Sequence, residues 1–160
     1  MAAGGGPAAA HTKMNTQEQY KKSLLNAYTN ANQTLTTDGV IRFNNVNVDD
    51  GCSIDFTPGA TTIALGKPGV YLITMDASVS DSGTPGVVTM QLYRNGVGIN
   101  GATSTITTTA STSIYPLSVT TLVKVLPSCC AIDNTANITV VNTGVGAIYA
   151  NANITVIKLC

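Results

Sequence analysis

Apolar and polar side chains alternate along most of the chain after Thr37, in short runs that end at turn residues. Residues 70–79 give the clearest example, because Tyr71, Ile73 and Met75 share one face of an extended strand. Neighbouring side chains of a strand point to opposite faces, so this pattern predicts strands with one buried face. It predicts nine strands, at residues 40–43, 53–56, 61–65, 70–79, 87–94, 97–107, 114–126, 136–142 and 148–159.

Turn dipeptides separate these runs. Asn95-Gly96 stands between two apolar runs, and both residues tolerate the positive φ of a tight hairpin turn. Lys67-Pro68-Gly69 and several further dipeptides that contain Gly or Pro also mark turns between the runs. Nine or ten short strands without helices between them indicate an antiparallel sandwich or barrel.

The last run has apolar residues at both sets of alternate positions. In a regular strand one face would carry Ile148, Ala150, Ala152, Ile154 and Val156, and the other would carry Tyr149, Ile157 and Leu159. A strand that is apolar on both sides is buried on both sides. We expect its small residues to let copies of the chain approach closely in a closed homotrimer. A monomeric sandwich with a fully buried last strand is the alternative.

Residues 16–31 carry a helical signal. Thr16 and Gln19 fit a capping box, and apolar residues then recur at spacings of three and four. The apolar stripe consists of Tyr20, Leu24, Ala27, Tyr28 and Ala31. Because so short a helix is marginally stable in water, its apolar stripe needs a surface to pack against. That surface is a second copy of the chain, the β domain or a foreign protein.

The chain therefore divides into a flexible Ala- and Gly-rich arm at residues 1–14, a helical anchor segment at 15–36 and a β head domain at 37–160.

The composition supports a β protein. Val, Ile and Thr together account for 51 of the 160 residues, whereas Glu occurs once and Trp not at all. Helical surfaces are normally rich in Glu, Lys, Gln and Arg, so a mostly helical protein is excluded. Charged residues make up only 10% of the chain, so we expect its uncharged faces to associate.

Charge and hydropathy exclude two kinds of partner. The 8 basic and 8 acidic residues balance, so the chain has no electrostatic footprint for nucleic acid. No apolar run reaches the roughly 20 residues of a membrane-spanning helix, and the first residues show no signal-peptide pattern. We expect synthesis in a cytoplasm, with neither a nucleic-acid nor a membrane partner.

The residues for catalysis are lacking in the β domain. The single His is His11 in the arm, and the single Glu is Glu18 in the helical segment. No Ser-His-Asp or Cys-His set can form inside the β domain, and isolated residues such as Asp76 and Asp81 are typical of turns. We expect no enzyme activity and no cofactor.

Metal sites are disfavoured for similar reasons. Asp49 and Asp50, with Asp55 nearby, offer oxygens to Ca²⁺, but their spacing matches no dedicated loop and a solvated turn is the better interpretation. Adjacent Cys129 and Cys130 point apart in an extended backbone, which disfavours zinc.

The sequence does not determine which of the four cysteines form disulfides. They are Cys52, Cys129, Cys130 and Cys160. One of the adjacent pair bonded to Cys52 or to Cys160, or a bond between chains, is the arrangement we favour.

Two further patterns have plain interpretations. Asn32, Asn137 and Asn153 each begin an N-glycosylation triplet, which chance explains in a chain so rich in Asn and Thr. Residues 102–113 contain 9 Ser or Thr among 12 positions, which is typical of an outer strand whose hydroxyls face water.

Several segments, taken in order, resemble a known family. They are PGVYLITMDASVS at 68–80, MQLYRNGVGI at 90–99, VKVLP at 123–127, NITVVN at 137–142 and IYANANITVIKL at 148–159. Residues 37–160 resemble the trimeric jelly roll of the tumour-necrosis-factor superfamily, and within it the globular heads of complement and collagen-like proteins. This resemblance implies an all-β antiparallel jelly-roll sandwich of about ten strands that forms a homotrimer.

The resemblance also leads to a hypothesis about function. Relatives of this kind occur in head-fibre and capsid-decoration proteins of short-tailed phages, so we expect a structural virion protein on the capsid surface. Its capsid contacts would be Tyr20, Leu24, Leu25 and Tyr28 of the helical segment. A bacterial spore or cell-surface protein with the same head is the first alternative, although the sequence has no collagen-like Gly-X-Y stalk. A glycan-binding adhesin that uses the Thr- and Asn-rich loops at 95–113 is the second.

Overall fold

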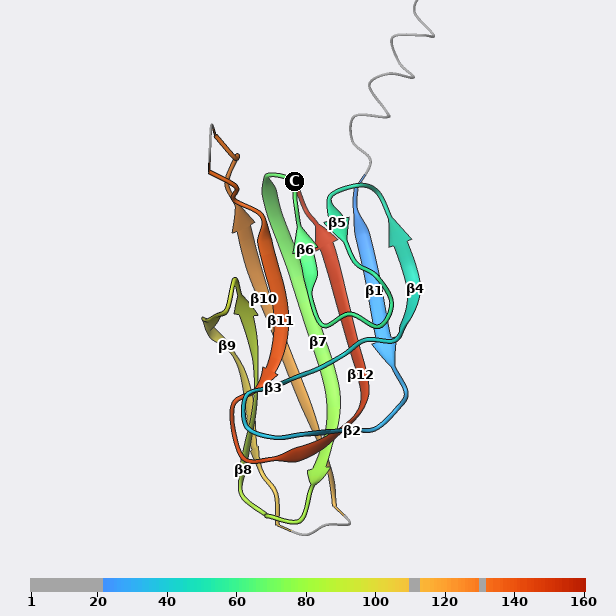
Figure 1. Cartoon of the computed structure of the whole chain (residues 1–160), viewed down its shortest axis with the longest axis vertical. Helices are drawn as coiled ribbons and strands as arrows, with labels where there is room; N and C mark the ends of the chain where they lie inside the picture. Colours follow the sequence, from blue (N-terminus) through green and yellow to red (C-terminus); the bar gives the residue numbers. More distant parts are fainter. Residues whose placement is uncertain (1–21, 110–112, 130–131) are drawn as a thin grey trace, which may run out of the picture.

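The computed structural model describes residues 22–109, 113–129 and 132–160 as two antiparallel sheets packed face to face (Figure 1). The arm expected at residues 1–14 lies outside these residues. The all-β antiparallel sandwich expected from the alternating pattern is confirmed. Among the described residues, no helix is long and apolar enough to cross a membrane.

The first sheet has the order β10-β7-β12-β1-β4. The short strand β2 pairs with the first residues of β12, whereas β1 pairs with its later residues. Its strands are β1 (Leu24–Thr29), β2 (Gln33–Leu35), β4 (Asn45–Asp50), β7 (Gly69–Asp81), β10 (Ile114–Val125) and β12 (Ala147–Lys158). The long strands β7 and β12 lie side by side at its centre, and β10 and β4 form its edges (Figure 1).

The second sheet has the order β5-β6-β11-β8-β9, with β3 paired to β11. Its strands are β3 (Gly39–Val40), β5 (Ile54–Asp55), β6 (Ile63–Leu65), β8 (Val87–Arg94), β9 (Val97–Thr107) and β11 (Ala136–Asn142). β8 and β9 form the predicted hairpin, and Asn95 and Gly96 between them have φ values of 50° and 79°. This strand pair turns tightly because both residues adopt the left-handed backbone conformation.

The core lies between the sheets and follows the predicted alternation. In β7, Tyr71, Ile73 and Met75 are fully buried, and Met90 of β8 in the other sheet is buried in the same core cluster. Further buried residues that follow the same alternation in β7, β8 and β10 are Ala77, Val79, Val88, Leu92, Leu117, Val119, Val123 and Val125. Apolar burial of this extent supplies most of the free energy that offsets chain ordering.

The helix expected over residues 16–31 is wrong for the part that the structure describes, because residues 24–29 form β1. Leu25 and Ala27 point into the core, while β1 pairs with both β12 and β4. Tertiary pairing and burial override a weak local helical preference, since so short a helix has little stability of its own. The sandwich therefore begins before residue 37 and includes part of the segment that we expected to be an anchor.

The expected face of the last strand is also wrong, because β12 contains a bulge. Its register with β7 shifts between Ala150 and Asn153, and Asn151 has a φ of 50°. One extra residue reverses the alternation downstream. Ile148 and Ala150 therefore face outward, whereas four of the residues proposed for that strand lie in the core, namely Tyr149, Ala152, Ile154 and Val156.

Candidate functional site

The outer face of the first sheet carries an apolar row across four neighbouring strands. The pairing registers align Leu122 of β10 with Leu72 of β7, Leu72 with Ile157 of β12, and Ile157 with Leu24 of β1. Leu122 is 58% exposed, and the other three are partly buried. We call this outer face of the first sheet the association face. A soluble sheet normally places polar residues on such a face, so this row needs a partner surface.

Next to the apolar row lies a row of hydroxyl and amide groups. Thr120, Thr74 and Thr155 align across β10, β7 and β12, and Asn26 of β1 continues the row. Asn26 donates to Oγ1 of Thr155 at 2.9 Å and to Oδ1 of Asn153 at 2.9 Å. Because Asn26 and Thr155 already bond to each other, covering these two side chains leaves few of their polar groups unsatisfied.

A single carboxylate lies in the third row. Asp76 accepts a hydrogen bond of 2.6 Å from the Ser118 hydroxyl and is aligned with Asn153. The sequence analysis counted Asp76 among residues typical of turns, although the predicted strand at 70–79 includes it, and the structure places it within β7. The cross-strand neighbours of Asp76 are Ser118 and Asn153, so the register places no opposite charge directly beside this carboxylate.

Exposed large apolar side chains gather on the first sheet. Of the eight in the described part of the chain, five lie on its strands or directly after them, namely Val48, Ile114, Leu122, Leu126 and Leu159. The second sheet has Val87 and Val97. This distribution makes the association face the best candidate for burial against other copies of the chain.

The free edge of β10 is covered by side chains of the second sheet. The Ser104 hydroxyl accepts a hydrogen bond of 3.3 Å from the backbone N–H of Ser118, and Arg94 donates at 2.8 Å to the carbonyl of Lys124. An uncovered edge strand recruits other strands, and this protection limits that route. Association through the sheet face is therefore favoured over strand addition at β10.

The structure separates the residues predicted to contact a capsid. Leu24 and Tyr28 are partly buried on the association face, whereas Leu25 is 1% exposed and belongs to the core. Leu25 is thus unavailable to a partner in the folded chain. Tyr20 lies outside the described residues.

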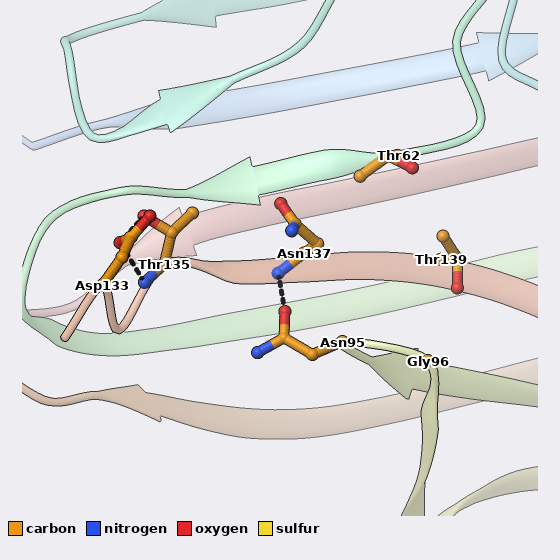
Figure 2. A pocket seen from close by; sticks show the side chains of 7 residues that line it. All are labelled: Thr62, Asn95, Gly96, Asp133, Thr135, Asn137 and Thr139. Atoms are coloured by element: carbon orange, nitrogen blue, oxygen red, sulfur yellow. Dashed lines mark hydrogen bonds between the residues drawn. The ribbon is translucent and has the colours of Figure 1, made fainter.

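A second candidate site is a polar groove on the outer face of the second sheet, with a volume of about 680 Å³. Figure 2 shows its seven lining residues, which are Thr62, Asn95, Gly96, Asp133, Thr135, Asn137 and Thr139. Asn137 and Thr139 come from β11, Asn95 and Gly96 from the β8–β9 turn, and Thr62 from the residue before β6. The sequence interpretation missed this groove, although polar residues at alternate positions 135, 137 and 139 were a visible signal.

Hydrogen bonds fix two side chains of the polar groove. Oδ1 of Asn95 accepts a bond of 2.8 Å from the backbone N–H of Asn137. Oδ1 of Asp133 accepts bonds from the backbone N–H and the hydroxyl of Thr135, at 2.9 and 2.7 Å. These bonds lower the pKa of Asp133, so its carboxylate is charged at neutral pH.

The carboxylates and cysteines considered for metal binding or disulfides are exposed where the structure describes them. No group of three or more His, Cys, Asp and Glu that could hold a metal occurs in residues 22–109, 113–129 and 132–160. Asp49 and Asp50 lie exposed on the edge strand β4, and Oδ1 of Asp50 accepts a bond from the N–H of Gly51. Cys52 and Cys160 are exposed free thiols, and Cys130 lies outside the described residues.

The fold is that of known jelly-roll domains. The globular domain of zebrafish complement 1qA protein superimposes with a TM-score of 0.62 and 12% identity, over 86% of this chain and 98% of that domain. Eiger TNF from S. frugiperda gives a TM-score of 0.59 and 12% identity, over 87% and 92%. The chain therefore has the jelly roll that TNF and complement globular domains share, which confirms the fold that the resemblance implied.

PRD1 vertex protein P5 gives a TM-score of 0.48 with 20% identity, over 86% of this chain and 97% of that protein. This similarity is too low to establish a common fold. No protein-family model matches the sequence, and no curated protein matches it.

Proposed function

We propose that the protein is a structural, non-enzymatic subunit that forms a homotrimer through the association face. The observation that carries this proposal is the apolar row of Leu24, Leu72, Leu122 and Ile157 across four strands. Burying the row against other copies removes apolar area from water, at roughly 25 cal/mol per Å². Closed symmetry buries the same face on every copy and ends the assembly.

The location in the proposal is the surface of a phage capsid, which the sequence resemblance implies. The attachment segment is residues 1–21, because β1 from Leu24 onward belongs to the sandwich. Leu24 pairs with Ile157, so the chain enters the sandwich at the end where β12 finishes (Figure 1). Attachment through residues 1–21 would then present the opposite end, with the β7–β8 loop, to the outside.

Light scattering during size exclusion tests the trimer. The wild-type chain is expected at three times its 16.4 kDa mass at micromolar concentration. Leu122→Asp places a charge in the apolar row and is expected to abolish the trimer, because a buried unpaired carboxylate is costly. Val97→Asp is the matched control, since Val97 is 69% exposed on the second sheet. A wild-type monomer, or a trimer unaffected by Leu122→Asp, would show that the association face is misassigned.

Attachment is tested by deleting residues 1–21. The truncated protein keeps every described strand and is expected to form trimers that no longer join capsids. Co-sedimentation with capsids measures this, with the full chain as the control. Decoration at full occupancy by the truncated protein would contradict the assigned attachment segment without affecting the proposed trimer.

A further inference from the structure

The polar groove has the size of a small-ligand site. Its volume of about 680 Å³ falls within the roughly 300–1,000 Å³ of known ligand pockets. Unlike most such pockets, it is lined only by Thr, Asn, Asp and Gly. We propose that this groove binds a neutral sugar.

The free polar groups of the groove match sugar hydroxyls. Thr62, Thr139 and the side-chain amide of Asn137 make no side-chain hydrogen bond to another described residue, and Figure 2 shows them together at the groove. An amide both donates and accepts, and a threonine hydroxyl does the same. Neighbouring sugar hydroxyls present the complementary set, so one sugar ring is able to use several of these groups at once.

Two of the lining side chains are already held in place. Asn95 is fixed by its bond to the N–H of Asn137, which leaves its Nδ2 group available as a donor. Asp133 is fixed through Oδ1 by Thr135, which leaves Oδ2 as an acceptor. Groups that are ordered before binding lose less conformational entropy when a ligand arrives.

The charges of the groove exclude acidic ligands. None of its seven lining residues is cationic, and the carboxylate of Asp133 is its one charge. Phosphates and acidic sugars require Arg, Lys or an equivalent set of donors, and Asp133 repels them. A neutral sugar carries no charge to be balanced, and one of its hydroxyls is able to donate a charge-assisted hydrogen bond to the carboxylate of Asp133.

An aromatic residue adjoins the groove. Tyr93 of β8 is the cross-strand neighbour of Thr139, and on its other side it pairs with Gly98. Tyr93 is partly exposed, and neither neighbour has a bulky side chain. Its ring is an apolar surface beside the polar groove, which suits the C–H face of a sugar. The loops 95–113 lack an aromatic residue, and pairing between β8 and β11 supplies one.

The groove lies on the second sheet and the association face on the first, so the proposed trimer leaves three copies of the groove open. Each single site is shallow, and linked sites raise the overall affinity for a surface that displays many sugars. The groove itself is complete within one chain and does not depend on the trimer.

The test is a glycan array of neutral and sialylated glycans probed with the full-length protein, followed by titration with the strongest neutral glycan. Asn137→Ala is expected to weaken binding about tenfold, because it removes an amide from the centre of the groove. Asn100→Ala is the matched control, since Asn100 is an exposed asparagine of β9 that does not line the groove. Circular dichroism verifies that both variants are folded.

Specific outcomes would overturn this inference. They are an array without neutral-glycan signals, binding restricted to sialylated glycans, and equal affinities of the Asn137→Ala and Asn100→Ala proteins. A trimer without glycan binding would reject the sugar site alone, whereas glycan binding by a monomer would reject the proposed assembly alone.

Discussion

The hydroxyl of Tyr149 donates a hydrogen bond of 3.1 Å to Oδ1 of Asn142, and both residues are fully buried. Tyr149 belongs to the first sheet and Asn142 to the second, so the bond joins the two layers. The amide of Asn142 also donates to the carbonyls of Thr36 and Val145, at 3.1 and 2.9 Å. This network satisfies buried polar groups and connects the two sheets at one point.

We predict that Tyr149→Phe lowers the free energy of unfolding by about 1–2 kcal/mol, because Oδ1 of Asn142 loses its donor in a buried site. Urea denaturation followed by circular dichroism measures the change. Tyr115→Phe is the control, because the hydroxyl of Tyr115 bonds to Thr109 at an exposed position and its loss is expected to cost less. Equal stabilities of the Tyr149→Phe and wild-type proteins would contradict the structural importance of the network.

Burial of Tyr149 also predicts a loss of stability at alkaline pH. Desolvation raises the pKa of this phenol above its usual value of 10.0. Above pH 10 the unfolded chain releases this proton while the folded chain keeps it, so stability falls as pH rises. The slope is about 1.4 kcal/mol per pH unit for one such tyrosine. In Tyr149→Phe this slope is expected to be smaller, and urea midpoints measured at pH 9, 10 and 11 decide the point.

The bulge in β12 predicts an unusual tolerance for glycine. Asn151 has a φ of 50°, which costs a β-branched residue about 1–2 kcal/mol and costs glycine almost nothing. Asn151→Val is therefore expected to lower the thermal midpoint, and Asn151→Gly to leave it nearly unchanged. Differential scanning calorimetry compares the two variants. Equal midpoints would mean that the backbone at this position is not left-handed.

Removal of β1 is expected to prevent folding. Deleting residues 1–35 removes Leu25 and Ala27 from the core and leaves the edges of β12 and β4 unpaired. The loss of a buried Leu alone costs about 2–5 kcal/mol, which is a large part of the stability of a typical domain. Proton NMR spectra show whether this variant is folded, and the variant that lacks only residues 1–21 is the control. A folded spectrum for the protein that lacks residues 1–35 would contradict the placement of β1.

A buried carboxylate offers a route to higher stability. Asp81 is 5% exposed, and its Oδ1 atom has no hydrogen-bond partner in the described structure. Asp81→Asn keeps the shape and removes the charge, so we predict an increase of about 1 kcal/mol in the free energy of unfolding. Asp76→Asn is the control on the same strand, where the carboxylate is exposed and accepts a bond from Ser118. A stability decrease for Asp81→Asn would mean that the charge has a favourable partner.

Strands with strict alternation were predictable, and segments with two competing patterns were not. Residues 87–94, 97–107 and 136–142 were predicted with the bounds that the structure has. In residues 24–29 a helical spacing coexists with the alternation of Leu25, Ala27 and Thr29, and only the presence of β12 and β4 decides between them. Residues 45–50 form β4, and although Asn and Val alternate at 45–48, this short and mostly exposed run was not predicted as a strand.

The two candidate sites were predictable to different degrees. The association face was expected on the last strand, but the bulge at Asn151 placed Ile154 in the core and left Ile157 outside. The polar groove unites Thr62, Asn95 and Asn137, which are far apart in the sequence. Sequence patterns report the spacing along one strand, whereas a groove depends on which strands become neighbours.

The amino-acid sequence alone determined the class of fold, since short alternating runs of β-branched residues with turn dipeptides between them bury one face only in a layered sheet. The tertiary structure decided which strands pair, where the bulge in β12 reverses the side chains that face the core, and which polar residues meet on the second sheet. The physical reason is that alternation is a local property of one strand. Pairing partners and registers are chosen instead by the total burial and hydrogen bonding of the whole chain.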